Sequence, residues 1–145
     1  MKDLPPLYFV VAVVLAALPF FFLNQYNMVS FPLNLIGIVP VLLGVQLNRL
    51  ADGEFKKRDT PHDFSAPTTL VDSGILRYTR NPMYLGLILM LIGIALLWGN
   101  PASLAGALVF FLVMEFRTIP FEEKLMTERF GDAYVQYKAR VRRWI

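Results

Sequence analysis

The fold class follows from residues 4–23, LPPLYFVVAVVLAALPFFFL, which form an unbroken apolar run. A helix of this length rises about 30 Å, enough to cross the hydrocarbon core of a bilayer. Shorter apolar runs follow at Phe31–Leu47, Met83–Trp98 and Ala102–Met114. The chain of 145 residues is 56% hydrophobic and only 17% charged, whereas an average soluble domain is about 25% charged. We therefore predict an all-α polytopic membrane protein with about four transmembrane helices.

The basic residues predict how these helices are oriented. None of the 14 lysines and arginines lies in Asn24–Ser30 or in Gly99–Pro101. With four spans, all the remaining polar segments fall on one face of the membrane, which the positive-inside rule makes cytoplasmic. We therefore expect both termini to be cytoplasmic. The net charge of +3 then reflects topology, and binding to nucleic acid is not expected.

Composition excludes several kinds of site. The chain has no cysteine and one histidine, His62, so neither a thiolate metal site nor a cysteine nucleophile can form. A Ser-His-Asp triad is disfavoured, and His62 lies in a turn-like stretch that we interpret as a solvated loop. We expect no metal site.

Local signals divide the chain into segments. Asn81-Pro82 and Asn100-Pro101 each place a capping asparagine before a proline at the first helical position. We expect small residues such as Gly86 to let the last two helices pack closely. The predicted organisation is a single integral membrane domain over 1–145, with two spans in 1–48, a cytoplasmic loop in 49–81, a helical hairpin in 82–119 and a C-terminal helix in 120–145.

The two long polar segments are candidates for function. The connection Asn48–Asn81 is long for a loop in a compact domain. The fourth apolar run is short, and we expect its helix to continue through Glu115 and Arg117. The tail from Pro120 is predicted to form an amphipathic helix, bent at Gly131, with one face made of Tyr134, Tyr137, Val141 and Trp144. From periodicity alone, this helix could equally lie on the membrane surface with its basic face towards anionic lipid.

Several motifs in these segments occur together and in order. Residues 74–86 read GILRYTRNPMYLG, and EE at 122–123, FGDAYVQY at 130–137 and VRRW at 141–144 follow. This pattern resembles the isoprenylcysteine carboxyl methyltransferase family, whose wider group includes the phospholipid methyltransferases. The resemblance covers about Leu70–Ile145. It implies a membrane-embedded enzyme that uses S-adenosyl-L-methionine, and the short chain resembles bacterial members, which implies a bacterial inner membrane.

The resemblance also implies site residues. In the family the arginine–proline–tyrosine segment and the paired glutamates help to form the cofactor pocket. Carried over, this pattern points to Arg80, Pro82, Tyr84, Gly86, Glu122 and Glu123 as cofactor-binding residues and to Arg117 and Asn81 as catalytic candidates. Eukaryotic members often have a histidine where this chain has Asn81, and an asparagine cannot shuttle a proton.

The chemistry of these side chains suits the cofactor independently. Carboxylates of Glu122 and Glu123 can bind its ammonium or ribose hydroxyls, and Arg80 can pair with its carboxylate. Tyr134 and Tyr137 offer aromatic faces for adenine or the sulfonium. The acceptor is expected to be a lipid-like or hydrophobic small molecule. A carboxylate is slightly favoured, because we identify no general base.

Plainer interpretations remain open. The two glutamates can be solvated charges, the arginines can only set topology, and Tyr84 can belong to an interfacial aromatic belt. Glu115, at the end of an apolar run, is either functional or paired with Arg117 or Arg80. The protein can instead be a non-enzymatic membrane subunit that binds a lipid or protein partner, or an NADPH-dependent membrane reductase. The sequence makes no prediction of oligomeric state.

Overall fold

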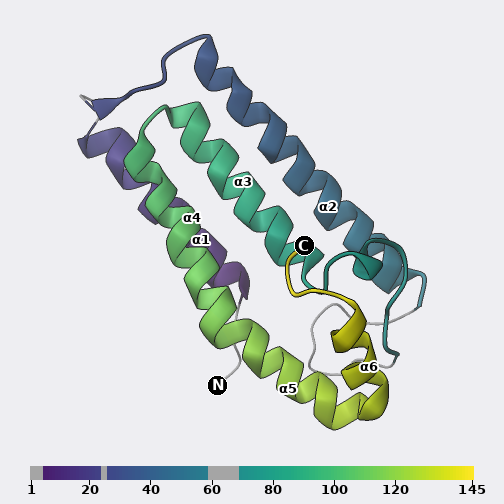
Figure 1. Ribbon diagram of the computed structural model, residues 1–145. Helices are drawn as coiled ribbons and strands as arrows, with labels where there is room; N and C mark the ends of the chain where they lie inside the picture. The colour runs from purple at the N-terminus through teal and green to yellow at the C-terminus, as the bar shows by residue number, and fades with distance from the viewer. Residues whose placement is uncertain (1–4, 24–25, 59–68) are drawn as a thin grey trace.

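The computed structural model describes residues 5–23, 26–58 and 69–145, and His62 lies outside these ranges. Its long helices are α1 (Pro5–Phe22), α2 (Ile38–Lys56), α3 (Pro82–Trp98) and α4 (Leu104–Val113). They lie side by side as a bundle, with α3 flanked by α2 and α4 (Figure 1). No strand occurs in the described ranges. The predicted all-α class is therefore confirmed.

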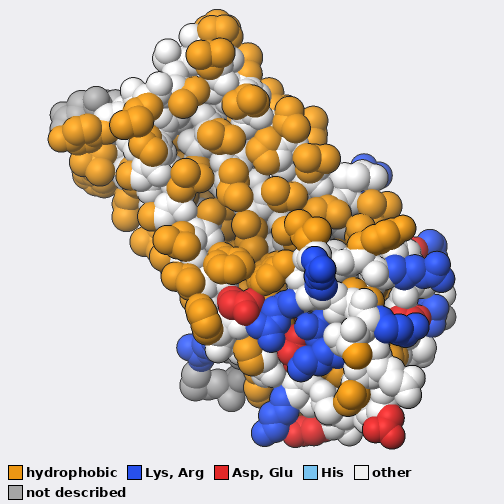
Figure 2. Space-filling model, in the orientation of Figure 1, with side chains coloured by type: hydrophobic (Ala, Val, Ile, Leu, Met, Phe, Trp, Pro, Cys, Tyr) orange, Lys and Arg blue, Asp and Glu red, His pale blue; other side chains and the backbone are white. Residues whose placement is uncertain are grey.

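The helices have the length and surface of membrane spans. Three stretches are long and apolar enough to cross a membrane, namely Pro5–Phe22, Leu33–Lys56 and Pro101–Phe130. The apolar helix α3 is shorter, with 17 residues. Large hydrophobic side chains point outward along most of the bundle, and Lys and Arg gather at one end (Figure 2). Soluble proteins rarely expose an apolar surface of this extent, so the fold is that of a polytopic membrane protein.

Glycines let two pairs of helices approach closely. Gly44 of α2 faces Gly86 of α3, and Gly37 faces Gly93, so that an added Cβ at any of the four would collide with backbone. Gly106 of α4 lies in the same way against α1. The prediction that small residues such as Gly86 pack the last two helices against each other is wrong for Gly86, Gly93 and Gly106, because each of these three faces an N-terminal segment instead. Small residues of this kind are the usual means of packing helices in lipid.

The two predicted asparagine caps have different outcomes. Asn100 accepts a hydrogen bond from Ala102 N at 3.0 Å, as expected of a cap. Asn81 stands at the start of α3, but its side chain makes no capping bond. Its Nδ2 instead donates to the carbonyl oxygen of Arg143 at 3.0 Å. Asn81 therefore occupies the predicted N-cap position, but the predicted capping bond is absent, and its side chain binds a distant segment instead.

The last span extends well beyond its apolar run, as predicted. Helix α4 continues through a π-helical turn, η5 (Met114–Thr118), into α5 (Ile119–Phe130). Pro120 explains the change of pitch, because proline has no N–H to donate to residue 116 and its ring crowds that carbonyl in a regular α-helix. Ile119 N bonds to Met114 O, five residues back. The π-turn thereby carries Glu115 to the polar end of the bundle.

The C-terminal segment turns back towards the bundle. Gly131, at a φ of 53°, separates α5 from α6 (Asp132–Arg140), which confirms the predicted bend. The helix ends at Arg140, and Val141 is extended at φ −115° and ψ 130°. The prediction that Val141 and Trp144 continue the helical face is therefore wrong. They belong to an extended tail whose polar groups bind elsewhere in the fold.

Helix α6 packs on protein within the polar end. The Tyr137 hydroxyl donates to Leu76 O at 2.8 Å, which fastens α6 to the short 3₁₀ helix η3 (Gly74–Arg77). Tyr134 and Tyr137 are buried together with Met126 and Val141. The tyrosine face of α6 is thus covered by the chain's own segments, and only the other face is exposed.

Candidate functional site

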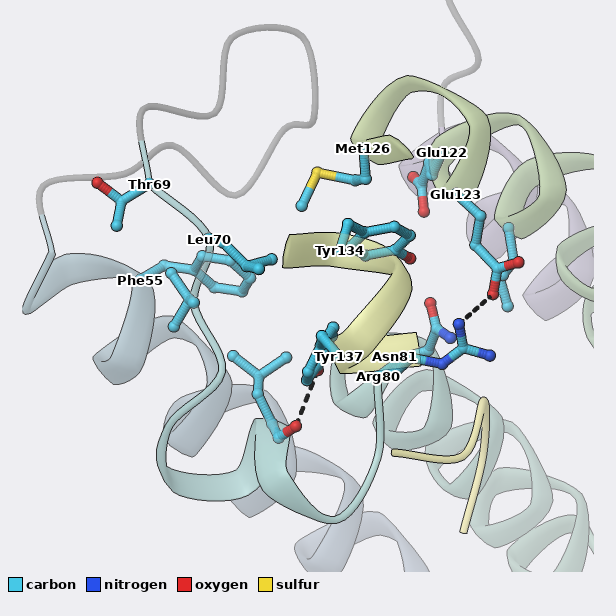
Figure 3. A pocket seen from close by; sticks show the side chains of 13 residues that line it. Phe55, Thr69, Leu70, Arg80, Asn81, Glu122, Glu123, Met126, Tyr134 and Tyr137 are labelled. Atoms are coloured by element: carbon cyan, nitrogen blue, oxygen red, sulfur yellow. Dashed lines mark hydrogen bonds and ion pairs between the residues drawn. The ribbon is translucent and has the colours of Figure 1, made fainter. Parts of the chain in front are cut away.

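A pocket lies at the polar end of the bundle, between the segment before α3, helix α5 and helix α6 (Figure 3). One wall is polar and the other is apolar and aromatic. The residues that line it are Phe55, Thr69, Leu70, Val71, Leu76, Arg80, Asn81, Ile119, Glu122, Glu123, Met126, Tyr134 and Tyr137. Residues as far apart in the sequence as Phe55 and Tyr137 therefore meet here.

Glu123 is the centre of an ion-pair cluster. Its Oε1 lies 3.0 Å from Arg80 Nη1, and its Oε2 lies 3.0 Å from Lys138 Nζ and 3.1 Å from Arg143 Nη2. The Glu123 side chain is only 8% exposed. A carboxylate removed from water in this way needs partners to offset its lost hydration. Both oxygens of Glu123 are engaged with cations, so its main effect is to hold those cations in place.

Glu122 occupies a different environment from its neighbour. It is half-buried, and its Oε1 accepts a hydrogen bond from the hydroxyl of Tyr84 at 2.5 Å. Tyr84 rises from the first turn of α3 and is buried. Glu122 lines the pocket, whereas Tyr84 does not. The tyrosine therefore orients a carboxylate that faces the pocket.

Arg80 supplies a donor to the same pocket. Its side chain is only 9% exposed, and one guanidinium nitrogen pairs with Glu123. Its Nε atom is buried and has no hydrogen-bond acceptor among the described residues. A buried donor left without an acceptor is rare in folded proteins and calls for a ligand or water. The site therefore fits an anionic group brought by a ligand.

The residues Arg142–Trp144, which we call the C-terminal strap, close one side of the site. Arg80 N donates to Arg142 O at 3.0 Å. The Arg143 guanidinium bridges two carboxylates, with Nη1 2.5 Å from Glu115 Oε1 and Nη2 3.1 Å from Glu123 Oε2. Trp144 Nε1 donates to Glu115 Oε2 at 2.8 Å. The strap thus ties the start of α3 to the π-turn and to α5.

Sequence reasoning missed this strap. Glu115 was interpreted as either functional or paired with Arg117 or Arg80, and its partners in the structure are Arg143 and Trp144. The pairing alternative named the wrong partners, because the tail, 28 residues further on, folds back onto the π-turn. The available signal was the VRRW motif, whose adjacent arginine and tryptophan offer one charged and one neutral donor to a carboxylate.

The hydroxyls of the two tyrosines of α6 are neutral. Burial raises the pKa of Tyr134 to about 12, and the nearby charge of Glu123 acts in the same direction. Burial likewise raises the pKa of Tyr137. Both hydroxyls therefore keep their protons at physiological pH. The ring of Tyr134 forms part of the wall opposite Glu122 and Glu123 (Figure 3).

The structure brings together most of the predicted site residues. Six of the ten line the pocket: Arg80, Asn81, Glu122, Glu123, Tyr134 and Tyr137. Tyr84 does not line the pocket but donates to Glu122, which does, and Pro82 is buried at the first position of α3. Gly86 faces Gly44 and Asn48 of α2 instead. The guanidinium of Arg117 lies 5.9 Å from the ring centroid of Tyr8, outside the pocket.

The pocket is narrow. Its cavity volume is about 40 Å³, whereas pockets that enclose a small molecule usually measure about 300–1,000 Å³. The residues present fit the polar groups of S-adenosyl-L-methionine in chemistry: an arginine donor for its carboxylate, a carboxylate for its ammonium and aromatic rings for its base. A cofactor of that size enters only if side chains of the apolar wall move.

The fold and the site together define an integral membrane protein with an arginine- and glutamate-lined pocket at the polar end of an apolar helical bundle. The chain belongs to the phospholipid methyltransferase family, whose model matches residues 33–133. The resemblance seen in the sequence motifs is thereby confirmed. No solved structure matches the chain significantly.

The similar proteins include methyltransferases of two kinds. A protein-S-isoprenylcysteine O-methyltransferase of Xenopus laevis is 31% identical over 112 residues, which are 75% of this chain and 39% of that protein. A methanethiol S-methyltransferase 1 of Bradyrhizobium diazoefficiens is 35% identical over 88 residues, 59% of this chain and 27% of that protein. An uncharacterized protein of Haemophilus influenzae is 41% identical over 63 residues, 43% of this chain and its entire length. This chain therefore spans less than half the length of the two methyltransferases.

Proposed function

We propose that this protein transfers a methyl group from S-adenosyl-L-methionine to a hydrophobic, membrane-borne acceptor. Family membership supports a methyltransferase. The single observation that carries the proposal is the pocket lined together by Arg80, Glu122 and Tyr134, in which the buried Nε of Arg80 has no acceptor among the residues that the structure describes. S-adenosyl-L-methionine carries a carboxylate, an ammonium group and an adenine ring. Arg80, Glu122 and Tyr134 offer a partner of the matching kind for each of these groups.

Each side chain has a distinct task in this proposal. Arg80 donates to the carboxylate of the cofactor, aided by the positive end of α3. Glu122 accepts from the ammonium or the ribose hydroxyls. Tyr134 and Tyr137 supply aromatic faces to the base or the sulfonium. Glu123 touches no ligand in this scheme and instead fixes the guanidinium of Arg80.

The acceptor approaches from the bilayer. When bound, the cofactor supplies an electrophilic methyl group that a nucleophile can take directly. The protein then aligns the two partners, which is worth up to roughly 7–11 kcal/mol in favourable cases. The two tyrosines of the pocket keep their protons, and both carboxylates accept bonds from neighbouring side chains. These side chains are therefore not poised to take a proton from the acceptor. We accordingly favour an acceptor that is already ionised, such as a carboxylate.

We also infer the orientation of the pocket. The lysines and arginines gather at the end that carries α5 and α6 (Figure 2), and basic segments favour the cytoplasmic side. The pocket then opens towards the cytoplasm, where S-adenosyl-L-methionine is made, with both termini on that side. A bacterial inner membrane is the membrane we propose.

Calorimetric titration with S-adenosylhomocysteine tests the proposal. Detergent-solubilised protein should bind it saturably, with a micromolar Kd. Binding should weaken at least tenfold in Arg80→Gln and Glu122→Gln variants, because each loses a charged hydrogen bond. Glu128→Gln is the matched control, because Glu128 lies on the same helix, is exposed and lies outside the pocket.

Other outcomes refute the proposal in distinct ways. Binding of NADPH instead of S-adenosylhomocysteine would indicate the reductase alternative. A folded, monodisperse sample that binds neither compound would support the non-enzymatic membrane subunit. Equal binding by the Glu122→Gln variant, the Arg80→Gln variant and the control would place the cofactor elsewhere.

A further inference from the structure

A second hollow lies beside the candidate cofactor pocket. Its cavity volume is about 290 Å³, and the residues that line it are Asp72, Arg77, Tyr137, Arg140 and Val141. It lies between the 3₁₀ helix η3 and the end of α6, outside the membrane-spanning stretches. Tyr137 lines both cavities. We call it the arginine hollow.

The charges at the arginine hollow are unbalanced. Asp72 is its one acidic residue, and Asp72 lies 3.6 Å from Arg140 Nη2 and 4.0 Å from Arg58 Nη2. These distances are at the long end for ion pairs, and the Arg140 side chain is 67% exposed. Arg77 is exposed and makes no ion pair with any described residue. Arg77 and Arg140 thus line the hollow, and its single carboxylate, that of Asp72, is shared between Arg140 and Arg58.

Arginine pairs of this kind suit a phosphate group. The planar guanidinium donates two parallel hydrogen bonds to phosphate oxygens and is less strongly hydrated than an ammonium. The two guanidiniums come from different elements, one from η3 and the other from the last turn of α6. A dianionic or monoanionic phosphate between them would offset the excess positive charge.

The position of the hollow indicates the source of that phosphate. Arg77 stands five positions before Pro82, the first residue of the apolar helix α3. Tyr78, between them, is 74% exposed, and exposed tyrosines beside apolar helices typically lie at the level of lipid headgroups. A membrane lipid can therefore place its phosphate at Arg77 while its chains remain along the bundle.

We propose that the arginine hollow binds the phosphate of an anionic membrane lipid, held between Arg77 and Arg140. Such a lipid joins η3 to α6, the two elements that the Tyr137–Leu76 hydrogen bond already connects. The same two elements contribute walls to the neighbouring pocket. By joining these two walls, the lipid stabilises the candidate cofactor pocket. This site does not depend on the methyl-transfer proposal, because none of its charged residues lines the candidate cofactor pocket.

The test is a calorimetric titration of the detergent-solubilised protein with dihexanoyl-phosphatidylglycerol. Parallel arms use the zwitterionic dihexanoyl-phosphatidylcholine, glycerol 3-phosphate and inorganic phosphate. We expect the anionic lipid to bind most tightly. Arg77→Gln and Arg140→Gln should each weaken it about fivefold, the effect of one basic residue near anionic lipid. Arg129→Gln removes the same charge from exposed α5 and should leave binding unchanged.

A further variant, which is expected to tighten lipid binding, distinguishes a loss of the binding site from a folding defect. Asp72→Asn removes the competing carboxylate and should tighten lipid binding, a result that misfolding cannot produce. The proposal is overturned if the Arg77 and Arg140 variants match Arg129→Gln, or if Asp72→Asn weakens binding. Inorganic phosphate or glycerol 3-phosphate that binds as tightly as the lipid would overturn the membrane source of the phosphate.

Discussion

Replacement of Arg143 by alanine should release the C-terminal strap. The wild-type guanidinium donates to Glu115 at 2.5 Å and to Glu123 at 3.1 and 3.3 Å. Its side chain is 27% exposed, so these charged bonds are only partly screened by solvent. After the substitution Glu123 keeps Arg80 and Lys138, and Glu115 keeps Trp144.

The size of the effect follows from these contacts. A hydrogen bond to a charged group contributes about 1.5–3 kcal/mol, and contacts made by one side chain do not add fully. Because each carboxylate retains another partner, we expect a loss of about 2 kcal/mol rather than the sum. This loss should appear as local opening of the strap. A loss of about 2 kcal/mol raises the equilibrium constant for that opening about thirtyfold.

Hydrogen exchange measures this opening at a defined amide. Arg80 N donates to Arg142 O in the strap, so the amide of Arg80 should exchange about thirtyfold faster in Arg143→Ala. Arg142→Ala is the matched control, since it removes the adjacent charge from an exposed side chain and leaves the backbone bond intact. Arg143→Lys should give an intermediate rate. Exchange in Arg143→Ala within about twofold of the Arg142→Ala control would refute the role of the strap.

Three further predictions concern packing, pH and a helix start. Gly86→Ala should prevent a monodisperse fold in size-exclusion chromatography, because its Cβ would meet the backbone of Gly44; Gly53→Ala, with open space at the Cβ, should fold normally. Thermal stability should fall as the pH rises from 10 to about 12, because the raised pKa of Tyr134 keeps it protonated in the fold while the unfolded chain ionises, and Tyr134→Phe should reduce this dependence. Asn100→Ala, which loses a cap and a 2.8 Å bond to the carbonyl oxygen of Leu23, directly after α1, should lower the free energy of unfolding by about 1–3 kcal/mol in thermal unfolding.

The membrane fold was largely predictable because apolar length is a local property. The runs that begin at Leu4 and Phe31 needed only composition and the thickness of a bilayer. The pairing of helices was not predictable in the same way. Gly86 and Gly106 indicate that some helix comes close, but nothing local shows that their partners are α2 and α1.

The end of the last helix shows a second limit. Apolar spacing continues through Val141 and Trp144, so periodicity extends the helix to the end of the chain. In the structure the helix stops at Arg140, because the backbone beyond it binds the segment before α3. The Asn81 cap failed for the same reason, since its side chain binds Arg143 O, 62 residues away. Long-range partners of polar groups override local signals in both places.

The two adjacent glutamates have different roles, because neighbouring positions on a helix point about 100° apart. Glu123 faces three cations, whereas Glu122 faces Tyr84 and the pocket. Glu123→Gln should therefore destabilise the fold by about 3–5 kcal/mol, since it removes the carboxylate that pairs with the buried guanidinium of Arg80.

Glu122→Gln should leave thermal stability nearly unchanged, because its amide oxygen still accepts from Tyr84. It should weaken binding of S-adenosylhomocysteine by about 1.5–3 kcal/mol, because it loses a charged acceptor. Thermal unfolding and calorimetry on the two variants separate these effects. Equal loss of ligand affinity in both variants, with unchanged stability in both, would mean that Glu123 also binds ligand directly, despite its three cations.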